Sequence, residues 1–173
     1  MGESNNHMRE IEIEKVTVNM GVGQTGQELD KACTILENIT GMKPLRTSCK
    51  VRIPTWGIRE GLLIGAKVTL RGKKAEEFLK KALNAKDNSV KGKSFDQKGN
   101  FGFGVKEHID MPGVKYDPKL GIRGLDVLVT LKRHGGYRLR RRKIGKKSIG
   151  SRHSLKKAEA MEFVKKKFGV EVK

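Results

Sequence analysis

Three glycines in the first part of the chain have the spacing of a phosphate-binding turn. Gly21-x-Gly23-x-x-Gly26 follows a run of alternating apolar residues that ends at Met20, and it precedes a helix-like segment. In dinucleotide-binding enzymes such a turn lets backbone amides approach a pyrophosphate at a helix N-terminus. The acidic residue expected about 20 positions later is absent, because the sequence there reads Gly41-Met-Lys-Pro44. We therefore favour the alternative, a tight strand-to-helix turn that needs no cofactor.

Other patterns typical of catalysis are weak. The segment Gly92-Lys-Ser94 lacks the first glycine of a phosphate loop, since Asp87 stands in its place. The histidines have no metal-ligand spacing and the cysteines form no disulfide framework; these residues are His7, His108, His134, His153, Cys33 and Cys49. Glu10, Glu12 and Glu14 alternate along one predicted strand, and we expect that face to be solvated. We predict that the protein is not an enzyme and binds no cofactor or metal.

The chain is strongly basic, and its charge is uneven. It has 173 residues and a formal net charge of +19. Residues 1–40 hold 3 basic and 7 acidic residues, a net charge of −4. Residues 41–131 hold 19 basic and 9 acidic residues, a net charge of +10, and residues 132–173 hold 16 basic and 3 acidic residues, a net charge of +13. A charge of this size indicates a polyanionic partner, with nucleic acid ahead of an anionic membrane. No apolar run has the length of a membrane span or a signal peptide, so we expect no membrane partner.

Two basic features point to nucleic acid. Trp56 lies between Arg52 and Arg59, an arrangement suited to base stacking and phosphate contact. The alternative, a Trp56 that anchors the loop to the core, stays open. The second feature is a basic run between glycines, for which we favour an extended arm along phosphates over a localisation signal, a membrane patch or a solubilising tail; its cations are Arg138, Arg140, Arg141, Arg142 and Lys143.

Hydrophobic periodicity predicts the elements that must position these residues. A bulge in the first strand would explain why Ile11 and Ile13 differ in parity from Val16. We predict strands over 11–20, 45–53, 64–71 and 125–131, and a strand or turn over 101–105. We also predict a protruding loop over 54–61 and a long exposed loop over 86–100. We expect three helices. The first spans 27–40, with Thr25 and Glu28 as a capping box, the second spans 73–85, and the third ends at 168 and has Ser154 as its N-cap.

These elements predict an α+β fold, with helices packed on a mostly antiparallel sheet and a basic C-terminal extension ending in a helix. We divide the chain into a flexible tail over 1–8, an RNA-binding core over 9–133, and a basic arm with its helix over 134–173. We expect the last helix to pack on the body through Leu155, Ala158, Met161, Val164 and Phe168.

Several sequence blocks occur in the order found in a known family. They are Asn19-Met-Gly-Val-Gly23, Leu36-Glu-x-Ile-Thr-Gly-x-Lys-Pro44, Trp56-Gly-Ile-Arg-x-Gly61, Ile64-Gly-x-Lys-Val-Thr-Leu-Arg-Gly72, Phe95-Asp-x-x-Gly-Asn100, and Tyr116-Asp117 followed by Arg123-Gly-Leu-Asp126. Over residues 8–131 the chain resembles the ribosomal protein L-five family of the large subunit. The basic tail resembles the archaeal and eukaryotic branch of that family.

The resemblance implies a function and a set of contacts. It implies a structural protein of the cytoplasmic ribosome that binds 5S rRNA in the central protuberance, with large-subunit rRNA and neighbouring ribosomal proteins as further partners. Asn19, Met42, Trp56 and Thr69 occupy family positions associated with 5S rRNA. Met42 stands where Gln is usual and lacks a side-chain amide. Trp56 stands where Phe is usual and keeps an aromatic face. A loop over residues 52–60, which includes Arg52 and Arg59, would face the P-site tRNA.

The residues around the two predicted strands over 45–53 and 64–71 agree with an RNA site. Cations there would hold phosphates without reading sequence; they are Lys43, Arg46, Lys50, Lys67 and Arg71. The competing interpretation from the same charge pattern is a nonspecific RNA-binding or RNA-chaperone protein.

Overall fold

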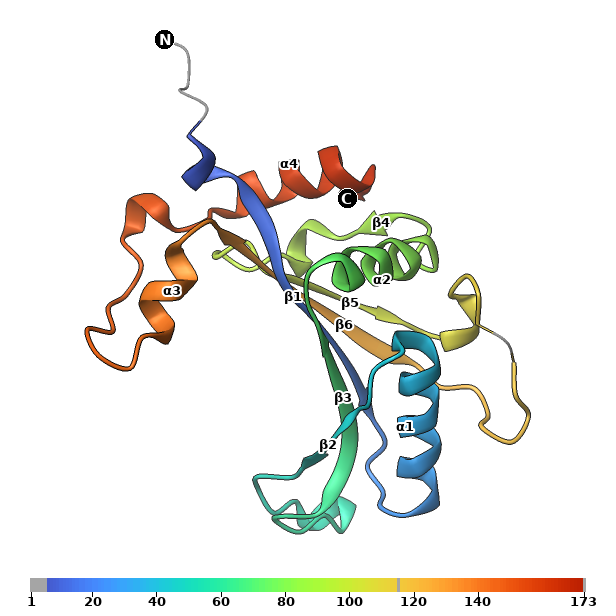
Figure 1. Cartoon of the computed structure of the whole chain (residues 1–173). Coiled ribbons are helices and arrows are strands. Elements are labelled where there is room, and N and C mark those ends of the chain that lie inside the picture. Colours follow the sequence, from blue (N-terminus) through green and yellow to red (C-terminus); the bar gives the residue numbers. More distant parts are fainter. Residues whose placement is uncertain (1–5, 115, 173) are drawn as a thin grey trace.

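The protein is built on a five-stranded antiparallel sheet (Figure 1). The computed structural model describes residues 6–114 and 116–172. The strand order is β2-β3-β1-β6-β5, and the strands are β1 (Ile11–Gly21), β2 (Leu45–Ser48), β3 (Leu63–Leu70), β5 (Phe101–Val105) and β6 (Leu125–Arg133). The fold is α+β, as the sequence predicts. β2 ends at Ser48, earlier than the predicted end of that strand at residue 53.

A bulge in the central strand sets which side chains face the core. The register of β1 against β6 shifts between Ile13, opposite Leu131, and Lys15, opposite Thr130. Because of the extra residue, Ile13 and Val16 both face the core although their parities differ. The predicted bulge is confirmed. It also removes Glu14 from the solvated face that the sequence predicts for it.

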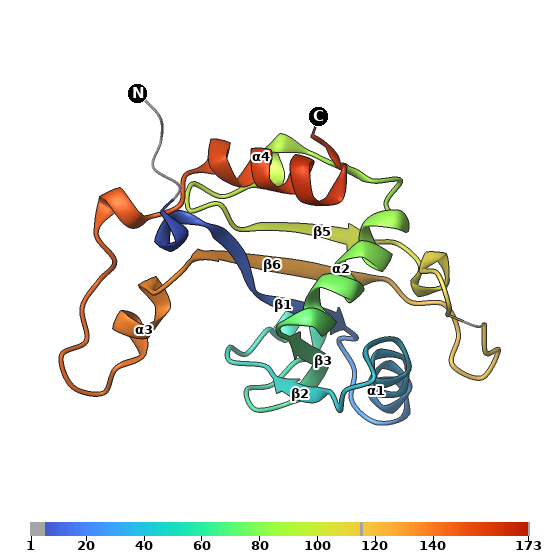
Figure 2. The same ribbon diagram turned by 45° about the horizontal axis from the view of Figure 1, so that its top comes forward.

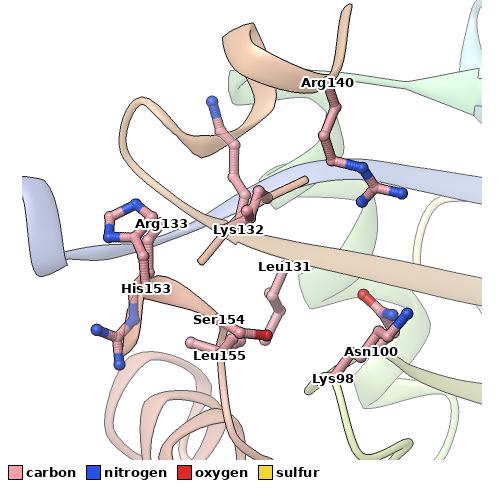
Figure 3. Close-up of a pocket in the computed structure, with 10 residues that line it drawn as sticks. Lys98, Asn100, Leu131, Lys132, Arg133, Arg140, His153, Ser154 and Leu155 are labelled. Carbon is pink, nitrogen blue, oxygen red and sulfur yellow. The ribbon is translucent and has the colours of Figure 1, made fainter. Parts of the chain in front are cut away.

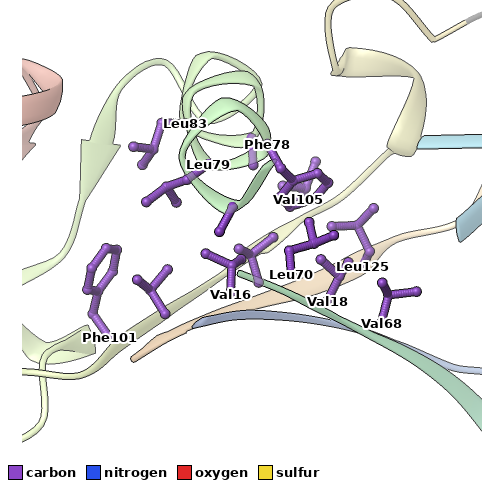
Figure 4. Close-up of a cluster of buried hydrophobic side chains, with 14 of the residues drawn as sticks. Val16, Val18, Val68, Leu70, Phe78, Leu79, Leu83, Phe101, Val105 and Leu125 are labelled. Atoms are coloured by element: carbon purple, nitrogen blue, oxygen red, sulfur yellow. The ribbon is translucent and has the colours of Figure 1, made fainter. Parts of the chain in front are cut away.

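Helices cover one face of this sheet. α1 (Gln27–Thr40) and α2 (Lys73–Asn84) follow β1 and β3, and α4 (Lys157–Phe168) comes near the end of the chain. Figure 4 shows Phe78, Leu79 and Leu83 of α2 above Val16 and Leu70 of the sheet. The helical period of apolar residues in α1 and α2 therefore predicts their buried faces correctly.

Two predicted helix caps are wrong. α1 begins after Gly26, whose positive φ of 88° makes it the N-cap, and no side chain caps the helix. Glu28 instead pairs with Arg123 and with Lys31. The N-cap of α4 is Lys156, not Ser154, and its amide donates to the Glu159 carboxylate.

The chain after β6 does not form the extended arm that the sequence predicts. Most of the basic run forms a short helix, α3 (Gly136–Arg141), and Figures 1 and 2 show α3 and α4 on opposite sides of β6. α4 shares the main core through Ala160 and Val164, and Leu155 just before it is buried in the same core. Ala158, which the sequence predicts to be buried, is exposed.

The predicted exposed loop over residues 86–100 is partly structured. β4 (Ser89–Val90) pairs in parallel with β7 (Glu171–Val172), so the end of the chain closes on this segment. Val90 and Phe95 are buried in the core. At the other end of the chain, residues 1–5 of the predicted flexible tail lie outside the described residues, and His7–Arg9 form a single 3-10 turn.

Candidate nucleic-acid interface

The sheet face opposite the helices is polar and accessible. Side chains alternate across a strand, so the neighbours of the core residues point to this face. We call it the open face and define it by nine partly or fully exposed residues: Lys15, Thr17, Asn19, Lys67, Thr69, Asp126, Leu128, Thr130 and Lys132. Four of its members are hydroxyl or amide side chains and three are lysines. This composition suits contacts to sugar hydroxyls and phosphates.

Strand register brings three predicted site residues together. Asn19 on β1 lies opposite Lys67 on β3, and Thr17 lies opposite Thr69. Cross-strand partners are about 4.5–5.5 Å apart between their Cβ atoms. Asn19, Lys67 and Thr69 therefore form one continuous patch. The sequence does not identify Thr17 and Lys132 as members of the same face, because their placement depends on the bulge and on the pairing of β1 with β6.

The loop between β2 and β3 presents the predicted stacking residue. Ile53 and Ile58 exchange backbone hydrogen bonds of 2.9 and 3.1 Å, which close a small turn around the 3-10 helix Pro54–Trp56. Ile58 is buried and fixes the base of this turn. Trp56 is 72% exposed at its tip, with Arg52 and Arg59 also exposed. The structure thus resolves the open alternative: Trp56 does not anchor the loop to the core.

The remaining predicted cations near this end of the sheet do not all share the open face. Lys43 and Lys50 are exposed in turns on either side of β2, and Met42 is exposed beside Lys43. Arg46 lies opposite Ala66, a core-facing residue, so it points to the helix side. Its guanidinium pairs with Asp30 of α1 at 2.7 Å. Arg46 therefore points to the side of the sheet opposite the Asn19 patch.

A buried carboxylate joins the sheet to the basic arm. Glu14, the extra residue of the bulge, is only 7% exposed. Its Oε1 lies 2.7 Å from the Arg141 guanidinium on α3 and 3.7 Å from that of Arg71 just after β3. The predicted solvation of Glu14 is wrong, since the sequence alone does not show that Arg141 and Arg71 pack against this side chain. Glu14 holds α3 beside the sheet, so Arg141 and Arg71 are held in place by it.

A pocket lies where the arm returns to the sheet (Figure 3). Lys98 and Lys132 line it with Arg133, Arg140 and His153. Lys132 has the Glu12 carboxylate at 3.4 Å and Arg133 has the Glu159 carboxylate at 2.6 Å. Cations from the turn before β5, the end of β6 and α3 thus surround one hollow, a composition that favours an anionic group such as a phosphate.

Profiles of one family match nearly the whole chain. The profile described as "Ribosomal protein L5" matches residues 6–59, and the profile for the C-terminal part of the same ribosomal family matches residues 63–163. This chain belongs to the ribosomal L5 family. The boundary between the two profiles falls in the loop that carries Trp56, just before β3.

Individual proteins of the L5 family are similar over almost their whole length. The chain is 52% identical over 166 residues to the large ribosomal subunit protein uL5 of Nanoarchaeum equitans, which covers 95% of this chain and 97% of that protein. It is 51% identical over 168 residues to uL5 of Sulfurisphaera tokodaii, with 96% and 94% covered. It is 52% identical over 167 residues to uL5 of Thermoplasma volcanium, with 96% and 98% covered. The predicted likeness to archaeal members is confirmed.

The glycine turn of this L5-family chain does not belong to a dinucleotide fold. β1, which precedes the turn, is antiparallel to both of its neighbours, β3 and β6. A dinucleotide-binding unit needs parallel strands joined by a crossover helix. Gly23 and Gly26 adopt φ of 76° and 88°, a left-handed backbone conformation that explains why glycine occupies these two positions.

The described part of this L5-family chain has no helix that is long and apolar enough to cross a bilayer.

The C-terminal helix of the L5-family fold is tied to the sheet by a carboxylate with a perturbed pKa. Burial opposes ionisation of Glu159, but hydrogen bonds from Arg133 and the Lys156 amide, together with both cations, outweigh it. The pKa of Glu159 is consequently below its ordinary value. Arg133 is 10% exposed, so this pair is better shielded than an ordinary surface pair.

We expect Glu159→Gln to destabilise the protein by about 1 kcal/mol at neutral pH, since it removes a charge-assisted bond while the exposed part of Glu159 is screened by solvent. A group with a lowered folded pKa stabilises the fold above its unfolded pKa and loses that effect as pH falls through the folded value. Urea unfolding at pH 7 and near pH 3 checks this. The variant and the parent should differ at pH 7 and converge in acid; an equal difference at both pH values would contradict the assignment.

Proposed function

We propose that this chain binds 5S rRNA on the open face of its sheet and contacts the P-site tRNA through the loop that carries Trp56. Membership of the ribosomal L5 family makes it a structural constituent of the large subunit of the cytoplasmic ribosome, and not an enzyme. rRNA and neighbouring ribosomal proteins are its partners in that assembly. The 5S rRNA and tRNA contacts are the finer part of the proposal.

The observation that carries the proposal is the register of β1 and β3. It gathers Asn19, Lys67 and Thr69 on the open face, where all three side chains are partly or fully exposed. Amide and hydroxyl groups of this kind recognise 2′-hydroxyls and base edges, and Lys67 adds a phosphate contact. An A-form RNA helix offers these groups along its wide, shallow minor groove.

The arm extends this surface. Glu14 holds α3 near the start of β1, so the arginines of α3 continue the charge of the open face. The pocket around Lys132 and Arg140 supplies a second anion site, which we assign to an rRNA phosphate. Arg46, paired with Asp30, is less available for phosphate than the exposed Lys43 and Lys50.

A competition titration tests the assignment to 5S rRNA. Labelled 5S rRNA is bound to the full chain at moderate salt and challenged with excess unlabelled 5S rRNA, tRNA or an unrelated hairpin. We expect the unlabelled 5S rRNA alone to displace the label efficiently. Equal displacement by all three RNAs would support the alternative, a nonspecific RNA-binding or chaperone protein that acts by counterion release.

We expect Trp56→Ala to weaken RNA binding by about 1–3 kcal/mol, the usual contribution of one stacked base. That corresponds to about 5- to 150-fold in Kd. Trp56→Phe keeps an aromatic face and should retain most of the affinity. Fluorescence anisotropy with 5S rRNA and, separately, with tRNA shows which RNA stacks on the loop. Because Trp56 is exposed, neither variant should change the thermal unfolding curve, and an unchanged Kd for both RNAs in Trp56→Ala would contradict the stacking role.

A further inference from the structure

Two histidines and a carboxylate converge at one end of the β1–β6 pair. His7 lies in the N-terminal 3-10 turn, Glu10 precedes β1, and His134 follows β6. The Nδ1 of His7 is 2.9 Å from the Oε2 of Glu10, and the two imidazole rings have centroids 4.4 Å apart. One donor atom from each of the three residues lies within 4.8 Å of the other two. The linear sequence shows no metal-ligand spacing because His134 is so distant from the other two.

Strand pairing explains why these residues meet. Ile11 lies opposite Arg133 in the antiparallel register, so the next positions outward are Glu10 and His134. Asn6 then caps the 3-10 turn by accepting a hydrogen bond of 3.0 Å from the Met8 amide, which turns His7 back toward the sheet. Figure 2 shows this N-terminal turn beside the segment that follows β6. The arrangement therefore rests on backbone contacts, and not on the three side chains alone.

A further set of contacts holds His134 itself. Its Nε2 lies 2.8 Å from the Oε1 of Glu12, and its backbone oxygen lies 2.9 Å from the Nε2 of His153. A carboxylate on one nitrogen of a histidine is the usual outer partner of a metal-binding imidazole, since it fixes the ring and raises its basicity. With Nε2 engaged by Glu12, Nδ1 is the ring nitrogen left to take a metal.

We propose that His7, Glu10 and His134 bind a divalent transition-metal ion, with Zn²⁺ as the ion best matched to the donors. Two imidazole nitrogens and one carboxylate oxygen form a donor set that Zn²⁺ accepts, with water in the fourth position. Tetrahedral ligands about 2.0–2.1 Å from the ion lie about 3.3 Å from one another. The side chains of His7 and Glu10 are 72% and 54% exposed, so they can rotate the short distance needed.

Two carboxylates beside His134 favour a cation here although the chain as a whole is strongly basic. Glu10 and Glu12 both lie beside His134, and Lys132 is engaged with Glu12 at 3.4 Å. A bound ion would join the N-terminal turn to the turn from which α3 and the basic arm begin. The site would thus fix the start of the arm independently of RNA.

The test is a titration of the full chain without RNA, after chelator treatment. Zn²⁺ binding is followed by calorimetry, and Co²⁺ is used as a spectroscopic probe whose visible absorption reports four-coordinate nitrogen and oxygen ligation. We expect one ion per chain. His7→Ala and His134→Ala should each raise the Kd at least about tenfold, and Glu12→Gln should raise it about 10- to 100-fold as an outer partner.

Two control variants keep the test decisive. Glu37→Gln removes an exposed carboxylate on α1, and Cys33→Ser with Cys49→Ser removes the thiols that could bind the same ions. Both should bind Zn²⁺ as the parent does. No binding by the parent, equal binding by the His7 and His134 variants, or loss of binding in the cysteine variant would each overturn the proposal. Because no RNA is present, the outcome is independent of the 5S rRNA assignment.

Discussion

We expect a variant in which four cations of the basic arm are replaced by glutamine to lose much of the salt dependence of 5S rRNA binding. The four residues are Arg138, Arg140, Arg142 and Lys143. Removing one phosphate contact lowers the slope of log K against log salt by about 0.7–0.9, so the four changes should lower it by about 3. Over a fourfold rise in salt, the parent would then lose about 60-fold more affinity than the variant. Binding isotherms at several salt concentrations measure this slope directly.

The choice of residues follows from the structure of the arm. Arg141 is kept because its 2.7 Å ion pair with Glu14 holds α3 against the sheet, and its loss would confuse charge with position. Glutamine is a good helix former, so α3 should persist in the variant. Circular dichroism and the unfolding midpoint should match those of the parent.

A second fourfold variant separates a directed surface from bulk charge. Four exposed lysines on α2 lie in the helical layer, on the side of the sheet opposite the open face; they are Lys73, Lys74, Lys80 and Lys81. Their replacement by glutamine removes four positive charges, as in the arm variant. We expect the salt slope of this control to fall much less. Equal changes in both variants would contradict an interface that runs from the open face onto the arm.

Local pattern predicts most of the fold because burial has a fixed period in each element type. Leu29, Ala32 and Leu36 recur at helical spacing, and α1 has the predicted bounds of Gln27–Thr40. Val127 and Val129 alternate, and they lie on the core face of β6. Such elements need no knowledge of their neighbours.

The errors occur where tertiary contacts override local preference. Thr25 fits a helix cap, but Gly26 takes that position through its positive φ, and Glu28 pairs with Arg123 instead. The composition of the basic run predicts an extended arm, yet Arg141 pairs with Glu14 on the sheet and the segment forms α3. The two pairs join residues that are 95 and 127 positions apart, which no short window of sequence can show.

The candidate site is only partly predictable from the sequence, because tertiary contacts decide which of its residues lie together. The family resemblance singles out Asn19 and Thr69 and the charge pattern singles out Lys67, but only strand register shows that they share a face. Position along the chain groups Arg46 with them, whereas its pairing with Ala66 turns it to the other side. The cluster of His7, Glu10 and His134 has no signal in the linear sequence at all.

A buried glycine, Gly99, lies where the turn before β5 contacts the C-terminal helix. Gly99 has φ of 76° in a turn held by Asp96, whose carboxylate accepts bonds from the Lys98 amide and the Asn100 side chain. These hydrogen bonds, the Lys98 amide first, keep the pKa of Asp96 below its usual value. A Cβ on Gly99 would lie 2.6 Å from the Cδ2 of Leu155 and 2.9 Å from the Cβ of Ala160.

We therefore expect Gly99→Ala to destabilise the protein by about 3 kcal/mol. The left-handed backbone contributes about 1 kcal/mol and the overlap about 1–3 kcal/mol. Leu155 can change rotamer, but the Cβ of Ala160 is fixed to α4, so the helix itself must move. Gly41→Ala is the matched control, since Gly41 has φ of 62° and open space around its Cβ. It should cost only about 1 kcal/mol in urea unfolding. Hydrogen exchange should show added loss of protection in α4 for Gly99→Ala alone; equal costs for the two variants would mean that α4 does not depend on this close approach.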